Sequence, residues 1–481
     1  MTVDEQAEPA SSAFFFSFLL FVALAPLYKA SNRPLPLLLL ELAAIGFLLV
    51  LARGGLHSAV APLPGRLLLA IGLLLGYPLL QCIPLPEAIW RELPGHADYA
   101  ALVARFAPAA GEGWNHAVSI VPAATERGWL ALLPPLACFL CVQRLSPRDI
   151  VRLLLAMAII AGLESLLGLL QVRAARDSIF YILSDVAHGT AAGTFVNHNH
   201  FAAMLAMMLP VVVGLLVYSI RFGRRRLRPA TFSFDPDAAS QRVLLFLSAL
   251  LLMLCLFFTG SRAGIASALV GLAGSSILFT RARSGVRHAS AIVAGLVAMA
   301  IAVAALIGLS PLLGGLTVEQ LGISGAGRLA LAAATLRAAI EFLPFGSGLS
   351  TFADVFPRYQ LEVFGGYIDH AHNDYLQFFM ETGVVAPVVV GLLLASYVIR
   401  TNELLRRDSR RSFIVLQLAA AIALLPLIVH SLFDFALHMP ANAMWYATLC
   451  GIVFHQGVQE RTRERHPRPR PARKSIGPAA R

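Results

Sequence analysis

Long apolar runs recur along the chain and restrict its fold more than any other feature. Segments such as 34–52 and 243–259 approach the ~20 apolar residues that cross a bilayer as a helix. Hydrophobic residues make up 58% of the 481 residues and charged residues 14%, and a soluble domain cannot bury that much apolar surface. The runs are continuous, without the alternation of membrane β-barrel strands. The sequence therefore predicts an all-α, polytopic membrane protein.

About twelve spans are expected, within a membrane domain that covers residues 1–456. They are 12–28, 34–52, 66–82, 128–143, 150–172, 200–220, 243–259, 263–280, 289–309, 376–399, 412–429 and 440–456. The first follows an acidic start, so we interpret it as a span and not as a cleavable signal peptide. The basic segment 457–481 is expected to be a disordered cytoplasmic tail.

Arginine residues indicate the orientation of the spans. If both termini are cytoplasmic, the inside connections after the fourth span contain the arginine clusters at 144–152, 221–228, 281–287 and 400–411. An excess of Lys and Arg marks the cytoplasmic side, so the net charge of +11 is mainly a topology signal. We expect membrane lipids, and no nucleic acid, as partners of the basic surface. The long connections at about 83–127 and 310–375 then lie outside.

Three polar clusters on the expected outer side lie beside apolar runs. "GTFVNHNHFAAML" places His198 and His200 before the sixth span, either as an interfacial cap or as part of a site. "FFTGSRAGIAS" places Arg262 near hydrocarbon. An ionisable group at such a position is a candidate functional residue, or its side chain extends along the apolar surface and places the charge in water. Arg328 follows a glycine-rich turn at the start of an expected helix that ends at Pro344. An anion could bind Arg328 there, although this arginine could equally be solvated.

A fourth cluster, "GGYIDHAHNDYLQFFMETG", contains five polar residues within six positions: Asp369, His370, His372, Asn373 and Asp374. Histidine accepts a proton near neutral pH, and adjacent carboxylates can orient its ring. A metal site on the two histidines is one alternative, and a simple helix cap before the tenth span is another. Because this segment offers too few residues that would serve as metal ligands, we expect no metal ion. We also expect no other cofactor.

Two further motifs have weaker implications. In "VHSLFDFALHMPANAMW", His430, Asp434 and His438 are spaced four apart and would share one face of a helix, either as a cavity lining or as an interhelical clamp. Cys138 and Cys141 form a CxxC pair within an apolar segment. A packing role is expected for them, since a second ligand pair is missing.

The order of these motifs carries a resemblance. "TGSRAG", an arginine in the large loop, "HAHNDYLQFFMETGVVA" and "HSLFDFALHMPANA" resemble the O-antigen ligase and O-antigen polymerase superfamily over roughly 190–450. The ligase signature is His, then Asn, Ser or Gln, nine residues, Gly, two residues and Gly. It falls on His372, Asn373, Gly383 and Ala386, so the last glycine is alanine here. The family also has an arginine followed four residues later by leucine. In this sequence Arg328 is followed at that distance by Ala332, so the leucine is missing.

The resemblance implies a metal-independent, inverting glycosyltransferase at the periplasmic face of the bacterial inner membrane, with 310–375 as a large periplasmic loop. Its donor would be a glycan on undecaprenyl pyrophosphate, and its acceptor a saccharide hydroxyl of lipid A core or of a growing glycan. The products would belong to O-antigen or exopolysaccharide assembly. The rival hypothesis is a transporter or flippase of lipid-linked saccharide, which inverted repeats would favour; no such repeats are evident in the sequence.

The resemblance also suggests roles for the polar residues. Arg262 and Arg328 would bind the pyrophosphate through rigid bidentate forks. His372 is the expected base, with His370 as the second candidate. Asp369 or Asp374 would hold the correct histidine tautomer. The remaining expected substrate-site residues are Asn373, His198, His200, His430 and Asp434.

Overall fold

The computed structural model describes residues 11–53, 63–106, 116–175, 178–181, 189–222, 238–281, 318–360, 367–407 and 412–456, and residues 291, 294, 295 and 298. Every regular element in these ranges is a helix. The expected ninth span, 289–309, lies outside the described residues except for those four, and the expected tail 457–481 lies wholly outside them.

Within the described ranges, six helices are long and apolar enough to cross a membrane. They are α2 (Pro34–Arg53), α8 (Pro147–Arg173), α9 (His198–Phe222), α10 (Ala238–Phe258), α17 (Val385–Arg406) and α18 (Ser412–His430). Other apolar helices occupy further expected spans: α1 (Ser12–Leu24), α3 (Gly65–Gln81), α7 (Leu133–Val142), α19 (Pro440–Phe454) and α11 (Arg262–Arg281), of which Arg262–Ile277 is the apolar part. The prediction of an all-helical, multi-pass membrane protein is confirmed.

Two expected spans are broken, so their prediction as single helices was wrong. The segment 128–143 is divided between α6 (Pro122–Leu130) and α7, whose first turn contains Pro134. The segment 376–399 is divided between α16 (Asp374–Thr382) and α17. Gly383 separates these two helices with a φ of +57°, a value that an α-helix does not use.

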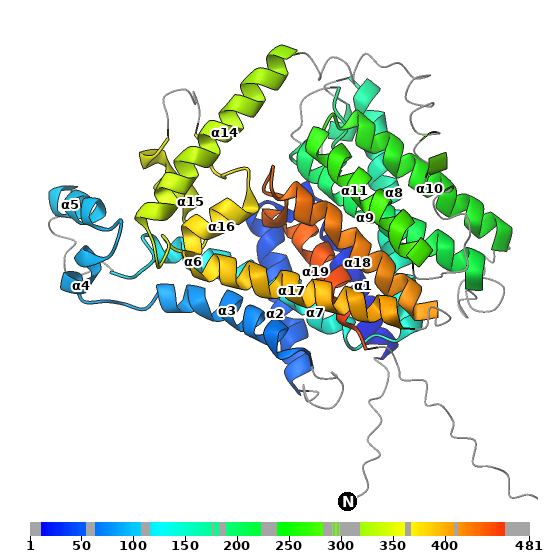
Figure 1. Ribbon diagram of the computed structural model, residues 1–481, viewed down its shortest axis with the longest axis horizontal. Helices are drawn as coiled ribbons and strands as arrows, with labels where there is room; N and C mark the ends of the chain where they lie inside the picture. The colour runs from blue at the N-terminus through cyan, green and yellow to red at the C-terminus, as the bar shows by residue number, and fades with distance from the viewer. Residues whose placement is uncertain are drawn as a thin grey trace, which may run out of the picture.

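Helix α9 forms the centre of the bundle, where α8, α10, α11 and α18 pack around it (Figure 1). Its side chains are buried from His200 to Ser219. Small residues allow the close packing: a Cβ on Gly264 of α11 would lie 2.5 Å from the Cβ of Ala202. This packing fixes the start of α9 beside the turn that precedes α11.

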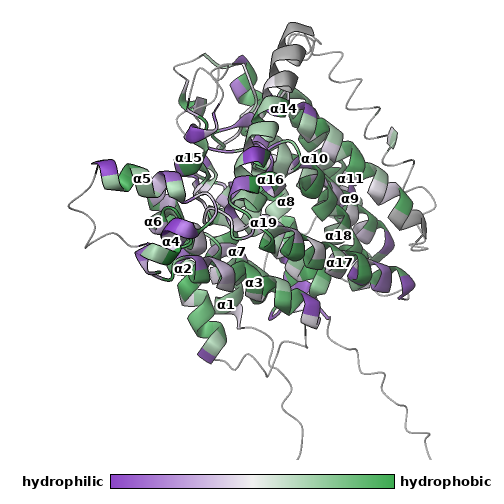
Figure 2. Cartoon of the chain, turned by 60° about the vertical axis from the view of Figure 1, so that its left-hand side comes forward, coloured by the Kyte–Doolittle hydropathy of each residue, from purple (hydrophilic) through white to green (hydrophobic). Residues whose placement is uncertain are grey.

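The two long connections pack together into a unit that we call the end domain. It comprises α4 (Glu87–Glu92), α5 (Ala97–Phe106), α14 (Val318–Glu341), α15 (Phe352–Val355), the 3-10 helix η4 (Phe356–Arg358) and α16. Ile120 of the first connection joins a core with Phe342, Phe352 and Met380, and its N–H donates to the Ser347 carbonyl at 2.9 Å. Figure 2 shows hydrophobic residues over the bundle helices and hydrophilic residues around α15 and α16.

Candidate active site

Two segments far apart in the sequence meet where α16 begins and α18 ends. The Asp374 N–H donates to the Ser431 carbonyl at 2.9 Å, and Asn373 Nδ2 donates to the Leu432 carbonyl at 3.0 Å. Asp374 Oδ2 accepts from Ser431 Oγ at 2.6 Å and from the Leu437 N–H at 3.1 Å. These bonds provide partners for backbone N–H and C=O groups that lie outside a regular helix.

The prediction that His430, Asp434 and His438 share one helix face is therefore wrong. Helix α18 ends at His430, Asp434 lies in the following turn, and His438 ends the 3-10 helix η5 (Ala436–His438). The contacts from Asn373 and Asp374 stabilise this non-helical chain, and they depend on residues about 60 positions away. Asn373 is also the N-cap of α16, because its Oδ1 accepts from the Leu376 N–H at 3.0 Å.

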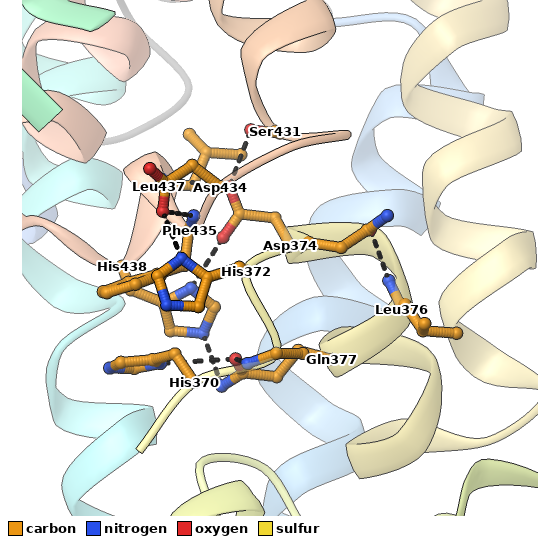
Figure 3. A network of polar contacts seen from close by, with 12 residues as sticks. His370, His372, Asp374, Leu376, Gln377, Ser431, Asp434, Phe435, Leu437 and His438 are labelled. Carbon is orange, nitrogen blue, oxygen red and sulfur yellow. Dashed lines mark hydrogen bonds and ion pairs between the residues drawn. The ribbon is translucent and has the colours of Figure 1, made fainter. Parts of the chain in front are cut away.

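His372 and Asp434 form a histidine–carboxylate pair at this junction (Figure 3). His372 Nδ1 donates to Asp434 Oδ1 at 3.1 Å, and His200 Nε2 lies 3.6 Å from the same oxygen. Asp434 is buried, whereas the His372 side chain is 32% exposed. Burial raises the pKa of Asp434, but hydrogen bonds and charge interactions with the two histidines outweigh it and hold the pKa well below its usual range. The pair leaves His372 Nε2 as the proton-accepting nitrogen.

The carboxylate beside His372 differs from the two that the sequence suggested. Asp374 instead accepts a hydrogen bond from Nδ1 of His438 at 2.7 Å, and Asp369 is exposed. Burial lowers the pKa of His438, but Asp374 and Glu381 more than offset it, so that this pKa is raised. Two histidine–carboxylate pairs therefore lie side by side, each with a buried carboxylate and a partly exposed histidine.

Phe435 lies among the histidines and orients their rings. Its ring stacks on His370 with centroids 4.0 Å apart, and it meets His200 and His372 edge-on at 4.4 and 4.9 Å. Burial lowers the pKa of His370 to about 3, assisted by the neighbouring His438. His370 is therefore neutral at physiological pH.

The other expected site residues lie around this junction. His198 is the first residue of α9 and interacts electrostatically with Arg328, an exposed residue of α14. The prediction that Arg328 lies at the start of a helix is wrong, because α14 begins at Val318 and continues through the glycine-rich segment. Arg262 is exposed at the first position of α11, directly after Ser261, whose Oγ accepts from the Gly264 N–H at 3.1 Å. The Ala191 N–H donates to the Phe258 carbonyl at 3.2 Å, which joins the approach to α9 with the end of α10. His430 is fully buried at the end of α18.

Among the described residues, no group of three His, Cys, Asp or Glu side chains is arranged to hold a metal ion. The arrangement instead offers a partly exposed histidine with an ionised partner, together with exposed guanidinium groups on the neighbouring elements. Such a set can accept a proton and bind an anion.

Sequence reasoning missed two buried residues of α16, Gln377 and Glu381. Both face the same side of the helix as Asp374, since positions 374, 377 and 381 follow helical spacing. A polar stripe on an otherwise apolar helix was the available signal. Phe435 was also missed, and an aromatic residue among other apolar residues gives no comparable signal.

Residues 246–391 match the family model for O-antigen ligase. The chain carries an O-antigen ligase domain. The matched region extends from α10 into α17, so the domain contains Arg262, Arg328, His370 and His372, whereas Asp434 follows it. The match assigns this membrane protein to polysaccharide biosynthesis. No curated protein matches the chain.

Proposed function

We propose that this O-antigen ligase family protein transfers a glycan from undecaprenyl pyrophosphate to a saccharide hydroxyl at the periplasmic face of the inner membrane. The observation that carries the proposal is the pairing of His372 with the buried Asp434 at 3.1 Å. A partly exposed imidazole that is held by an ionised carboxylate suits the removal of a proton from a hydroxyl group.

In the proposed step, the acceptor hydroxyl oxygen attacks the anomeric carbon of the donor. His372 Nε2 takes the hydroxyl proton, while Asp434 stabilises the imidazolium that forms. The bond from the anomeric carbon to the phosphate oxygen breaks, and its electron pair leaves with undecaprenyl pyrophosphate. Attack opposite to the leaving group inverts the anomeric configuration. A lipid A core sugar or the end of a growing glycan can supply the hydroxyl.

Arg262 and Arg328 are the proposed pyrophosphate ligands. Both are exposed, and the interaction of Arg328 with His198 supports its placement on the side of the bundle that holds the histidines. Guanidinium forks bind phosphate oxygens bidentately and stabilise the charge that develops on a leaving pyrophosphate. The scheme requires no metal ion, because two fixed positive charges act on a good leaving group.

The test uses purified full-length protein with undecaprenyl-pyrophosphate glycan as donor and a core oligosaccharide or the same glycan as acceptor. We expect undecaprenyl pyrophosphate to be released only when acceptor is added, with equal rates in the presence and absence of EDTA. The product glycan linkage, assigned by NMR, should have the inverted anomeric configuration. Acceptor-independent movement of donor across proteoliposomes, without release, would instead establish the transporter hypothesis.

A further inference from the structure

The side-chain amide of Gln377 lies between two of the histidines. Its Oε1 accepts from the Ala371 N–H at 3.1 Å and lies 3.2 Å from His370 Nδ1. Its Nε2 donates to Glu381 Oε1 at 3.0 Å. The same nitrogen lies 3.2 Å from His438 Nε2 (Figure 3). Gln377 is 1% exposed, so each of its polar atoms depends on these partners.

The partners determine which way the amide points. A backbone N–H can only donate, so the atom that faces Ala371 is the amide oxygen. The amide nitrogen then faces Glu381, whose other oxygen accepts from the Ser350 N–H at 2.8 Å. Reversal of the amide would place its NH₂ group against the Ala371 N–H and leave a buried donor unsatisfied.

This orientation assigns the protons of both rings. His370 Nδ1 must carry a proton to donate to the Gln377 oxygen, which leaves the lone pair on Nε2. His438 Nε2 must accept from the Gln377 NH₂ group, so the His438 proton lies on Nδ1, 2.7 Å from Asp374 Oδ1. One amide thus selects the same tautomer in two histidines.

We propose that Gln377 is a positioning residue that holds His370 with its proton on Nδ1 and directs Nε2 to the substrate, where it accepts a hydrogen bond from a sugar hydroxyl. The inference rests on the proposed function, because it names a binding contact of the same site. Stacking on Phe435 fixes the plane of the ring. In Figure 3 the second ring nitrogen points away from Gln377, and no other described residue forms a hydrogen bond with it.

The surroundings of His370 keep it neutral and so suit it to this task. The pKa of His370 is lowered to about 3, mainly by burial. His438 of η5, His200 of α9 and His372 also lower this pKa, although the hydrogen bond with Gln377 acts in the opposite direction. Glu381 lies beyond the Gln377 amide. His370 therefore accepts a hydrogen bond without taking the proton, which leaves proton transfer to His372.

The first experiment compares pH profiles of acceptor-dependent release. In Gln377→Glu, a carboxylate replaces the amide oxygen and favours protonated His370 and His438, so the acid limb should move up by about 1 pH unit or more. In Gln377→Leu, the rate should fall about tenfold or more at every pH, because the tautomer is no longer selected and buried partners lose their bonds.

Gln81 provides a matched control, since it is equally buried and contacts the same helix. Its Nε2 donates to the carbonyls of Phe345 and Glu381, and it contacts neither histidine. Gln81→Leu should change the rate or the stability but keep the wild-type profile shape. The inference would be wrong if Gln377→Glu kept the wild-type pH profile, or if Gln81→Leu displaced the profile in the same way. Either result would show that Gln377 has only a packing role.

The second experiment does not depend on glycan transfer. Diethyl pyrocarbonate acylates unprotonated imidazole, and peptide mass spectrometry reports its rate at each histidine. In the wild-type protein, His370 should react as fast at pH 5 as at pH 7. A slower reaction of His370 at pH 5, or no reaction of His370 at either pH, would overturn the inference. If only glycan transfer fails, with His370 reacting as expected, the proposed function is overturned and the inference about the His370 tautomer is not.

Discussion

His372 has a backbone φ of +49°, in the left-handed region that residues other than glycine rarely adopt. Such a conformation costs roughly 1–3 kcal/mol and persists where the surroundings fix it. Here the ring bonds to Asp434, and the next residue, Asn373, caps α16. The strained backbone places the imidazole between the buried carboxylate and solvent, as the proposed base requires.

We expect His372→Ala to lower glycan transfer by about 10²- to 10⁴-fold, the range typical of a general base. Donor binding should stay close to wild type, because the arginines supply it. Release of undecaprenyl pyrophosphate and equilibrium binding of labelled donor measure the two effects separately. A variant that transfers glycan at the wild-type rate would remove the base assignment.

The arginines carry a second prediction at this scale. Arg262→Lys and Arg328→Lys keep the charge but lose the bidentate fork, so both should weaken donor binding and transfer strongly, with the alanine variants at least as impaired. Arg337→Lys is the matched control, because Arg337 is another exposed arginine of α14. Full activity of either alanine variant would show that the arginine in question is only solvated.

Among the elements, the break between α16 and α17 decides the shape of the site. The Val384 N–H donates to the Pro344 carbonyl at 3.0 Å, and the Gly383 N–H donates to the Phe379 carbonyl at 2.9 Å. The break lets α16 pack against α14 while α17 packs against α3 (Figure 1). The short helix thereby presents Asp374, Gln377 and Glu381 to the junction.

We expect Gly383→Ala to destabilise the protein. An added Cβ would lie 2.1 Å from the Pro344 carbonyl oxygen, and the positive φ adds a strain of about 1–3 kcal/mol. In detergent, the variant should unfold at a lower temperature than the wild-type protein. The loss of the monodisperse chromatographic peak after heating measures this temperature. Gly391→Ala in α17 is the control, since nothing lies within 4 Å of its Cβ position, and it should unfold at or slightly above the wild-type temperature.

For the whole molecule, the two long connections form one end domain, and the arginine clusters belong to other connections along the sequence. Arg358 pairs with Asp98 of the first connection and with Glu341 at 2.9 Å, so the end domain is assembled from both. If the arginines mark the cytoplasm, the end domain and the histidines face the periplasm. A lipid-linked donor could then reach the site from the outer leaflet.

Cysteine labelling tests this orientation in a variant whose five native cysteines are replaced. Tyr367→Cys lies in an exposed part of the end domain, 69% accessible, and should react with an impermeant maleimide in intact spheroplasts. Arg407→Cys, exposed after α17, should react only after lysis. The reverse pattern would place the site in the cytoplasm and exclude a periplasmic reaction.

The sequence by itself determined the class of the fold and selected the segments that form the candidate site. Apolar runs predict helices because the interior of a bilayer leaves the backbone no other hydrogen-bond partners. Polar residues beside such runs mark functional positions because their burial is costly. This reasoning selected His372 and the arginines as candidates, and it predicted a helix in the region of α14, although α14 begins at Val318 and not at Arg328.

Only the tertiary structure decided which groups pair and where helices stop. Asp434, and not Asp369 or Asp374, meets His372, because the chain after α18 leaves the helix and its backbone bonds with Asn373 and Asp374. A helical pattern cannot reveal such an end when the compensating donors lie about 60 residues away. The break at Gly383 likewise depends on the distant Pro344 carbonyl. Local sequence encodes periodicity and polarity, whereas these pairings come from contacts between segments that meet only in the folded chain.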